Sequence, residues 1–313
     1  MSGSEVAVTR AARVVGGGAA VGFGCLAYAA LYEVNAFRLR EVEVPVLPGG
    51  SRPIRVLHLS DLHLTPNRTV RQRWVAGLAD LEPDLVVNTG DNLAHVDAVP
   101  YVTRSLGRLL AKPGVYVWGS NDYYAPTFKN PLRYLTRPSR LESANRKQLP
   151  WPDLDHAFSE AGWLNLTHRR AVLEINGVRV GFRGTDDPHL NRDHYSEVAG
   201  PIEVSAIDVA IGVTHAPYRR VIDAMAYDGH DLILAGHTHG GQVCVPFYGA
   251  LATNCDLDAK RVKGLSSHSV AGRTSALHVS AGLGTSPYAP IRFACPPEAT
   301  LMTLLPKIST LSS

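Results

Sequence analysis

Short apolar runs alternate with longer segments over most of the chain. Seven runs have the length and composition of strands, and they lie at 54–60, 84–90, 114–119, 178–184, 208–215, 231–237 and 276–282. Between several of them, apolar residues recur every three to four positions, which predicts helices at 70–81, 102–110 and 218–227. Strands that alternate with helices in this way predict a layered α/β fold.

An uncharged segment precedes this pattern. Residues 14–32 form a run of nineteen residues without a charge, with two arginines on either side. Because about 20 apolar residues span a bilayer, the run predicts a transmembrane helix or signal anchor in a single-pass membrane protein. A cleaved signal peptide is the alternative, since Ala27-Tyr28-Ala29 has the small-x-small form of a cleavage site. The balanced arginines leave the side of the membrane open.

The predicted domain organisation follows from these two patterns. Residues 41–53 hold three prolines and two adjacent glycines, which is typical of a linker. We therefore expect an N-terminal tail at 1–13, the membrane segment at 14–32, a linker at 33–53, one folded domain at 54–306 and a C-terminal tail at 307–313.

Composition narrows the classes of function. The 313 residues are 45% hydrophobic, enough for a packed core, and the formal net charge of +3 comes without long basic blocks, so nucleic acid is not an expected partner. The four cysteines show no paired short spacing, which argues against a disulfide framework or a zinc knuckle. Thirteen histidines are numerous for this length, and several stand beside glycine or aspartate at strand ends, which indicates metal binding.

Five of the predicted strands are followed by side chains that bind metals. These are Asp61 and His63, Asp91, Asn121, His215, and the pair His237 and His239. The carboxyl ends of strands in α/β sheets converge, so these groups can meet in space. Mixed carboxylate and imidazole donors suit Mn, Fe or Zn, whereas Ca and Mg prefer oxygen almost alone. Because the donors are too many for one ion, we expect two divalent metal ions bridged by a carboxylate.

The same residues lie in the motifs "SDLHL", "TGDN", "GSND", "THAP" and "GHTHGGQ", whose order resembles the calcineurin-like metallophosphoesterases over roughly residues 54–305. "GHTHGGQV" and the later "SAGLGTSPYAPIRFACPPEATLMTL" are similar to a bacterial membrane-anchored or exported branch that resembles phosphodiesterases of lipid-linked substrates. The resemblance implies a four-layer α-β-β-α sandwich of two mixed sheets flanked by helices. It also implies hydrolysis of a phosphate ester by a hydroxide held between two metals.

The resemblance further implies a role for each ligand. Asp91 would bridge both metals, and the remaining ligands would divide into one set of Asp61, His63 and His239 and a second set of His215, His237 and an amide from residues 120–121.

The turn in "GSND" departs from the Gly-Asn-His-Asp of the family. Ser120 stands where the family has a metal-binding Asn, and Asn121 stands where it has a catalytic His. Either Ser120 replaces the ligand, or a small backbone shift lets Asn121 serve the metal; we expect Asn121, because a carboxamide oxygen is the better donor. The missing imidazole removes a proton donor commonly worth about 10²–10⁴ in rate. Asp122 and His189 are candidates to replace it.

A membrane-anchored metal- or ligand-binding protein with little or no turnover is the alternative function, because the family's catalytic imidazole is absent. The complete ligand set favours the enzyme. On the resemblance alone, we expect a phosphodiesterase rather than a protein phosphatase, with a phosphate-ester substrate that is lipid-linked and with the membrane as a further partner.

Overall fold

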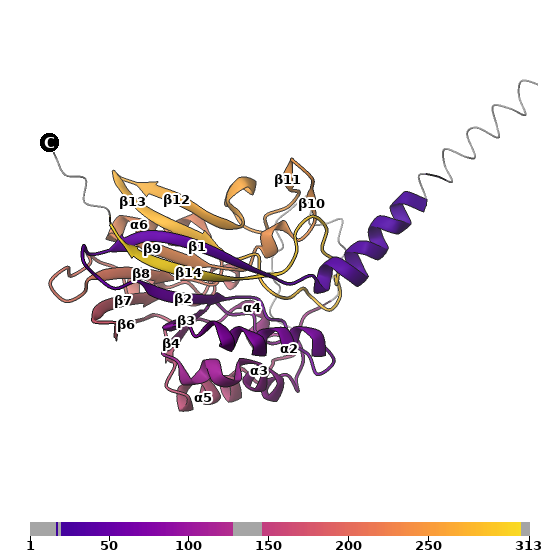
Figure 1. Ribbon diagram of the computed structural model, residues 1–313, viewed down its shortest axis with the longest axis horizontal. Helices are drawn as coiled ribbons and strands as arrows, with labels where there is room; N and C mark the ends of the chain where they lie inside the picture. Colours follow the sequence, from indigo (N-terminus) through magenta and orange to yellow (C-terminus); the bar gives the residue numbers. More distant parts are fainter. Residues whose placement is uncertain (1–16, 18–19, 128–145, 308–313) are drawn as a thin grey trace, which may run out of the picture.

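Two mixed six-stranded sheets pack face to face in the computed structural model of this chain (Figure 1). The structure describes residues 17, 20–127 and 146–307. The tail predicted at 1–13, part of the segment 14–32 and nearly all of the tail at 307–313 lie outside the described residues.

Each sheet combines parallel and antiparallel neighbours. The first has the order β1 (Arg38–Leu47), β14 (Glu298–Pro306), β2 (Ile54–Leu59), β3 (Leu85–Asn88), β4 (Gly114–Tyr116) and β5 (Leu164–Asn165), and only β14 and β2 pair antiparallel. The second has the order β12 (Gly264–Val270), β13 (Arg273–Val279), β9 (Leu232–Ala235), β8 (Val209–Val213), β7 (Val178–Gly184) and β6 (Arg169–Ile175), with both edge strands antiparallel to their neighbours.

Helices connect the strands and cover the outer faces of both sheets. The α-helices are α2 (Thr69–Gly77), α3 (Val99–Leu106), the single turn α4 (Ser120–Tyr123), α5 (Trp151–Glu160) and α6 (Arg219–Asp228). Short 3₁₀ turns lie at Glu33–Asn35, Leu78–Leu81, Gly107–Ala111, Pro188–Leu190, Tyr195–Glu197, His239–Gly241 and Ala259–Arg261. A two-stranded hairpin is formed by β10 (Cys244–Val245) and β11 (Gly249–Ala250).

Burial on both faces explains the continuous apolar runs of the central strands. In β2, Ile54 and Val56 belong to the core between the sheets, whereas Leu57 and Leu59 belong to the core under α2, α3 and α5. Such strands read as unbroken apolar runs rather than as alternating ones. With α6 packed on the second sheet through Met225 and its neighbours, the layers follow the order α-β-β-α (Figure 1). The predicted α/β fold with two mixed sheets is therefore confirmed.

Part of the predicted linker belongs to the folded domain. Arg38–Leu47 forms β1, which pairs with β14 over nearly its whole length. The linker prediction for residues 33–53 is therefore wrong for these ten residues. Pro45 and the prolines and glycines after it suggested irregular chain, but a proline is tolerated on an edge strand, where one side needs no hydrogen bond.

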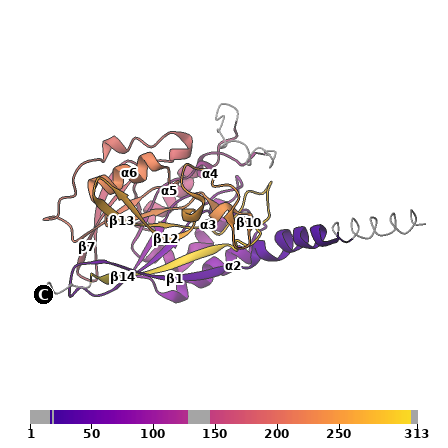
Figure 2. The same cartoon turned by 90° about the horizontal axis from the view of Figure 1, so that it is seen from above.

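Residues 20–32 are helical, and the last five of them, Tyr28–Tyr32, form a π-helical turn. Figures 1 and 2 show this helix projecting away from the two sheets. Phe23, Leu26 and Leu31 on it are more than 60% exposed. In the part of the chain that the structure describes, no helix has both the length and the hydropathy needed to cross a membrane.

A buried histidine remote from the predicted metal ligands makes stability sensitive to acid. Burial lowers the pKa of His230 to about 4, while its Nδ1 donates to the carbonyl oxygen of Met225. Histidine in an unfolded chain titrates near pH 6.5. As the pH falls from 6.5 to 4, the unfolded chain therefore binds a proton that the folded chain excludes, and the free energy of unfolding decreases.

We expect His230 alone to lower the free energy of unfolding by about 2 kcal/mol between pH 8 and pH 5 in the metal-free chain. His230→Asn keeps a donor for Met225 and removes the titration, so urea unfolding of this variant should lose that part of the pH dependence. The exposed His156 provides the control, and His156→Asn should leave the dependence unchanged. Identical pH dependence in wild type and His230→Asn would contradict the argument.

Candidate metal centre

The predicted ligands lie at one edge of the two sheets, in the turns that follow five strands: Asp61 and His63 after β2, Asp91 after β3, Asn121 in α4 after β4, His215 after β8, and His237 and His239 after β9. Contacts between these side chains cross from one sheet to the other. His239 Nε2 lies 3.7 Å from Asp61 Oδ1, and His215 Nε2 lies 3.6 Å from Asp91 Oδ2. The convergence predicted from the strand ends is thus present in the fold.

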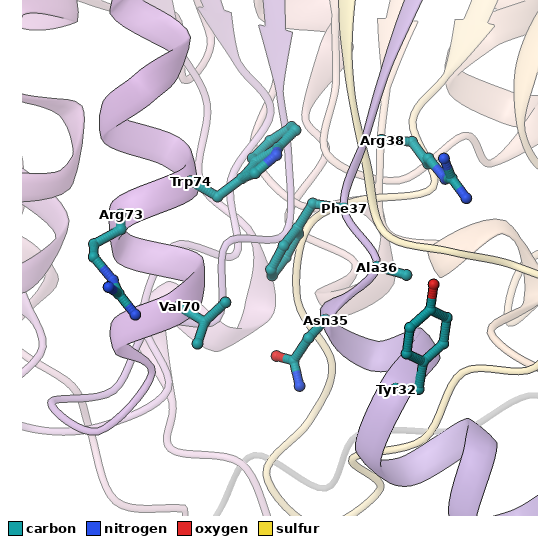
Figure 3. Close-up of a pocket in the computed structure, with 8 residues that line it drawn as sticks. All are labelled: Tyr32, Asn35, Ala36, Phe37, Arg38, Val70, Arg73 and Trp74. Atoms are coloured by element: carbon teal, nitrogen blue, oxygen red, sulfur yellow. The ribbon is translucent and has the colours of Figure 1, made fainter.

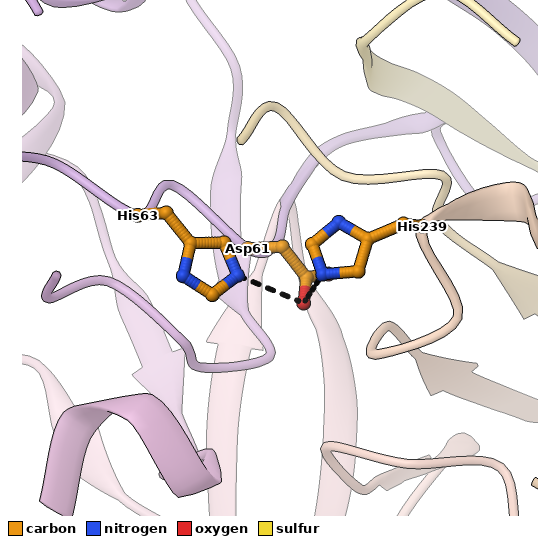
Figure 4. Close-up of side chains that lie close together, drawn as sticks. All are labelled: Asp61, His63 and His239. Carbon is orange, nitrogen blue, oxygen red and sulfur yellow. Dashed lines mark ion pairs between the residues drawn. The ribbon is translucent and has the colours of Figure 1, made fainter. Parts of the chain in front are cut away.

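Asp61, His63 and His239 form the first group (Figure 4). One ligand atom from each lies within 4.8 Å of the others, and Asp61 Oδ1 stands 4.0 Å from His63 Nε2. Asp61 Oδ1 and both ring nitrogens of His63 are buried and have no hydrogen-bond partner among the described residues. Buried polar atoms in a native structure normally have a partner, so these orphaned atoms fit a bound cation.

Asp91 joins this group to a second one. Its Oδ2 lies 3.5 Å from His63 Nε2 and 3.6 Å from His215 Nε2, and Asp61, Asp91 and His215 also place ligand atoms within 4.8 Å of one another. His237 completes the second group, with its Nδ1 3.2 Å from His215 Nε2. One carboxylate oxygen therefore stands between imidazoles that belong to different sheets.

Backbone carbonyl groups set the orientation of two imidazoles. His215 Nδ1 donates to the carbonyl oxygen of Thr89 at 2.7 Å, and His239 Nδ1 donates to that of Gly284 at 3.1 Å. A proton held on Nδ1 turns Nε2 toward the carboxylates as a ligand atom. This arrangement is the usual support of a metal-binding histidine.

The pKa values of the predicted histidine ligands shift in two opposite directions. Burial lowers the pKa of His63 to about 4 and holds the pKa values of His237 and His239 well below the ordinary one, so these imidazoles are neutral at pH 7. Burial also lowers the pKa of His215, but the Asp91 carboxylate outweighs it and the pKa ends well above the ordinary value. The interaction with His215 in turn lowers the pKa of Asp91 by more than burial raises it, so the pKa of this carboxyl stays well below its ordinary value. The ionised Asp91 is therefore stabilised by a positive neighbour.

The backbone of the ligand turns is strained. Positive φ angles, unusual for residues other than glycine, occur at Asp61 (52°), His63 (39°), Asp91 (57°), His237 (69°) and His239 (50°). Such conformations cost about 1–3 kcal/mol each and concentrate at functional sites. Gly119 is required for a different reason, because a Cβ atom there would lie 2.3 Å from Asp91 Oδ1. The donors, their burial and this close approach together fit borderline divalent metal ions.

The turn at residues 119–122, whose sequence differs from the family motif, places Asn121 in contact with Asp91. The Asn121 side-chain Nδ2 donates to Asp91 Oδ2 at 2.6 Å, and its backbone N–H donates to Asp91 Oδ1 at 2.7 Å. Ser120 Oγ lies 3.5 Å from the Asn121 Nδ2. Asn121 thus contacts Asp91 through its amide nitrogen and its backbone, and its role as the metal ligand of this turn stays a prediction.

The two predicted proton donors occupy different places. Asp122 is completely buried, and its carboxylate accepts hydrogen bonds from the backbone N–H groups of Asp91, Asn92 and Gly119 at 2.7–3.0 Å. Asp122 thus connects the turn after β3 to the turn between β4 and α4 by hydrogen bonds. His189 lies beside the cluster, with its ring centroid 4.4 Å from that of His237.

Several supporting residues were absent from the sequence-based predictions. Ser60 Oγ donates to Asp61 Oδ2 at 2.6 Å, and the Asn254 side chain lies 3.1 Å from His237 Nε2. The buried Arg292 donates to the carbonyl oxygens of Ala281, Gly282 and Gly284, at 2.7–3.0 Å. Ser60 could have been found as the residue before Asp-x-His, whereas Asn254 and Arg292 lie in irregular segments without a periodic signal.

Comparison with known proteins identifies the class. Residues 54–241 match the calcineurin-like phosphoesterase family, so the chain belongs to this family and is a metallophosphoesterase, a class of hydrolase that uses divalent metals. The resemblance seen in the motifs is confirmed.

Individual relatives agree with this assignment. The chain is 27% identical over 255 residues to the metallophosphoesterase YkoQ of Bacillus subtilis, covering 80% of this chain and 83% of that protein. It is 26% identical over 295 residues to the UDP-2,3-diacylglucosamine pyrophosphatase LpxG of Chlamydia trachomatis, covering 80% and 84%. It is also 29% identical over 213 residues to a transmembrane protein with metallophosphoesterase domain of Bos taurus, covering 64% of this chain and 44% of that protein.

We expect removal of the Asp91 carboxylate to weaken metal binding at both groups, because Asp91 Oδ2 lies 3.5 Å from His63 Nε2 and 3.6 Å from His215 Nε2. We expect wild type to retain two manganese ions per chain after gel filtration and Asp91→Ala to retain fewer than one, measured by elemental analysis. Asp97→Ala is the matched control, since the Asp97 side chain is 74% exposed and pairs with His95 outside the cluster. Two ions retained by Asp91→Ala would rule out the shared carboxylate.

Proposed function

We propose that the chain hydrolyses phosphodiesters at a centre of two divalent metal ions, Mn, Fe or Zn. In this proposal Asp61, His63 and His239 hold one ion, His215, His237 and Asn121 hold the other, and Asp91 serves both. The observation that carries the proposal is the position of Asp91 Oδ2, 3.5 Å from His63 and 3.6 Å from His215.

The bound ions would supply positive charge for the phosphoryl oxygens and lower the pKa of a water molecule. The protein supplies the rest. The neutral imidazoles of His63, His237 and His239 present lone pairs without prior loss of a proton, whereas His215, whose pKa is raised beside Asp91, would release a proton on binding a cation. Thr89 and Gly284 hold His215 and His239 in the required orientation. Asp122 positions the ligand turns through backbone hydrogen bonds rather than by contact with the substrate.

His189 supplies the proton that the leaving oxygen needs. The family's imidazole is replaced by Asn121, but the ring of His189 packs at 4.4 Å against that of His237 from another loop. The Tyr218 hydroxyl lies 3.0 Å from His189 Nδ1 and restrains the ring. An imidazole can therefore serve the same centre from a different part of the chain.

The identity of the leaving group tests this assignment. In a series of diesters, we expect wild type to show a shallow dependence of log rate on leaving-group pKa and His189→Gln to show a steep one. Alkyl esters should slow by about 10²–10⁴, and aryl esters, which leave without a proton, far less. His194→Gln, at an exposed histidine on the same loop, is the control and should behave as wild type.

A steep dependence already present in wild type, unchanged in His189→Gln, would exclude His189 as the donor. Metal binding without turnover of any ester would instead favour the alternative of a metal- or ligand-binding protein.

The substrate and the membrane segment belong to the same proposal. LpxG is named for a diacylglucosamine substrate, and the Bos taurus relative is named a transmembrane protein. With the apolar side chains exposed on residues 20–32, these names support a lipid-linked substrate and an N-terminal anchor at 14–32.

Extraction tests the anchor. We expect the full chain to sediment with membranes and to resist alkaline carbonate, because the apolar residues of the segment 14–32 favour the bilayer over water. The mature chain should still contain residues 14–32. A mature chain that begins at Ala30 would show instead that the segment is a cleaved signal peptide.

A further inference from the structure

Exposed apolar side chains gather at the end of the molecule that carries the metal centre. The hairpin of β10 and β11 follows directly after His239, and its tip exposes Phe247 completely and Tyr248 by 77%. Val245 and Leu251 at its base are more than 40% exposed. Large apolar side chains exposed side by side on a short hairpin usually mark an interaction site.

The hairpin is joined to the base of the N-terminal helix. Cys244 N donates to the carbonyl oxygen of Phe293 at 2.8 Å, and the Phe293 ring packs edge-on against Tyr28 of the helix at 6.2 Å. The backbone N–H of Arg292 donates to the carbonyl oxygen of Ala29. In Figures 1 and 2 the hairpin lies at the end of the sheets from which the helix leaves. The base of the hairpin and the foot of the helix are thus connected through residues 292–293.

A groove of about 560 Å³ at the foot of the helix has the composition of a membrane interface (Figure 3). Tyr32, Phe37 and Trp74 line it together with Arg38 and Arg73. Aromatic rings and arginines are enriched together at the level of lipid headgroups, where the rings contact both phases and the guanidinium groups meet phosphate. The occupant that fits both surfaces is a phospholipid bilayer.

The same surface is rigidly connected to the metal centre. Glu33, at the end of the helix, is buried, and its carboxylate accepts hydrogen bonds from the backbone N–H groups of Ala294 and Cys295 at 3.0 and 2.6 Å. Cys295 Sγ lies 3.4 Å from the carbonyl oxygen of His239, and Arg292 from the same segment holds the carbonyl oxygen of Gly284. The end of the helix and the turns that hold His239 and Gly284 are therefore connected through residues 292–295.

We propose that the hairpin tip, Phe247 and Tyr248, inserts into the surface of the bilayer beside the N-terminal helix and holds the metal centre against the lipid headgroups. The inference rests on the proposed hydrolysis and deepens it, because it defines the substrate class. A phosphodiester at the headgroup level of the same membrane reaches the centre without leaving the bilayer.

Fluorescence quenching tests the insertion directly. The full chain is placed in vesicles of phosphatidylcholine brominated along its acyl chains, and Tyr248→Trp is compared with Tyr227→Trp. Tyr227 is the matched control, since it is 61% exposed but lies on α6, away from the N-terminal helix in both views (Figures 1 and 2). After subtraction of wild-type fluorescence, the emission of the added tryptophan at 248 should fall at least about two-fold, and that at 227 should not change.

Phe247→Trp provides a second reporter at the tip. If neither tip tryptophan is quenched in chains that sediment with the vesicles, the inserted hairpin is refuted. Equal quenching at positions 227 and 248 would refute a fixed orientation. Hydrolysis of a soluble nitrophenyl diester is measured in the same samples. This hydrolysis depends on the metal centre and not on the hairpin, so its loss would contradict the proposed function, whereas loss of quenching alone would contradict only the inserted hairpin.

Discussion

The burial of two carboxylates between the sheets is the constraint on which the rest of this structure depends. Asp61 and Asp91 are almost completely excluded from water, and neither is paired with a lysine or an arginine among the residues that the structure describes. A buried charge is strongly unfavourable unless it is compensated. The protonated imidazole of His215 compensates Asp91, and in the proposed centre two cations would compensate both carboxylates.

This requirement explains the conformation of the loops. The turns that hold the predicted ligands have residues with positive φ angles. Side chains that are not predicted ligands support these turns, with the Asp122 carboxylate on one side and the Arg292 guanidinium on the other. Through Arg292 and Glu33, the support continues to the N-terminal helix. The metal-binding turns and the base of the N-terminal helix are therefore parts of one packed network.

Elements with a strong local pattern in the sequence were predicted correctly. Prediction failed where the structure depends on contacts between residues that are far apart in the sequence. The central strands and the residues at their ends were found because both faces of each strand are buried and each motif is contiguous. β1 was taken for linker, since Pro45 and the prolines and glycines that follow the strand hide a pairing with β14 more than 250 residues away. The places of His189, Asn254 and Arg292 depend on irregular loops, which no periodicity describes.

The most direct test of the account is anomalous diffraction from crystals of the full chain grown with manganese. The account predicts two manganese peaks about 3.5–4 Å apart, each with an oxygen of Asp91 among its ligands. A single peak, or two peaks of which one is out of reach of Asp91, would contradict the two-metal centre built around this carboxylate.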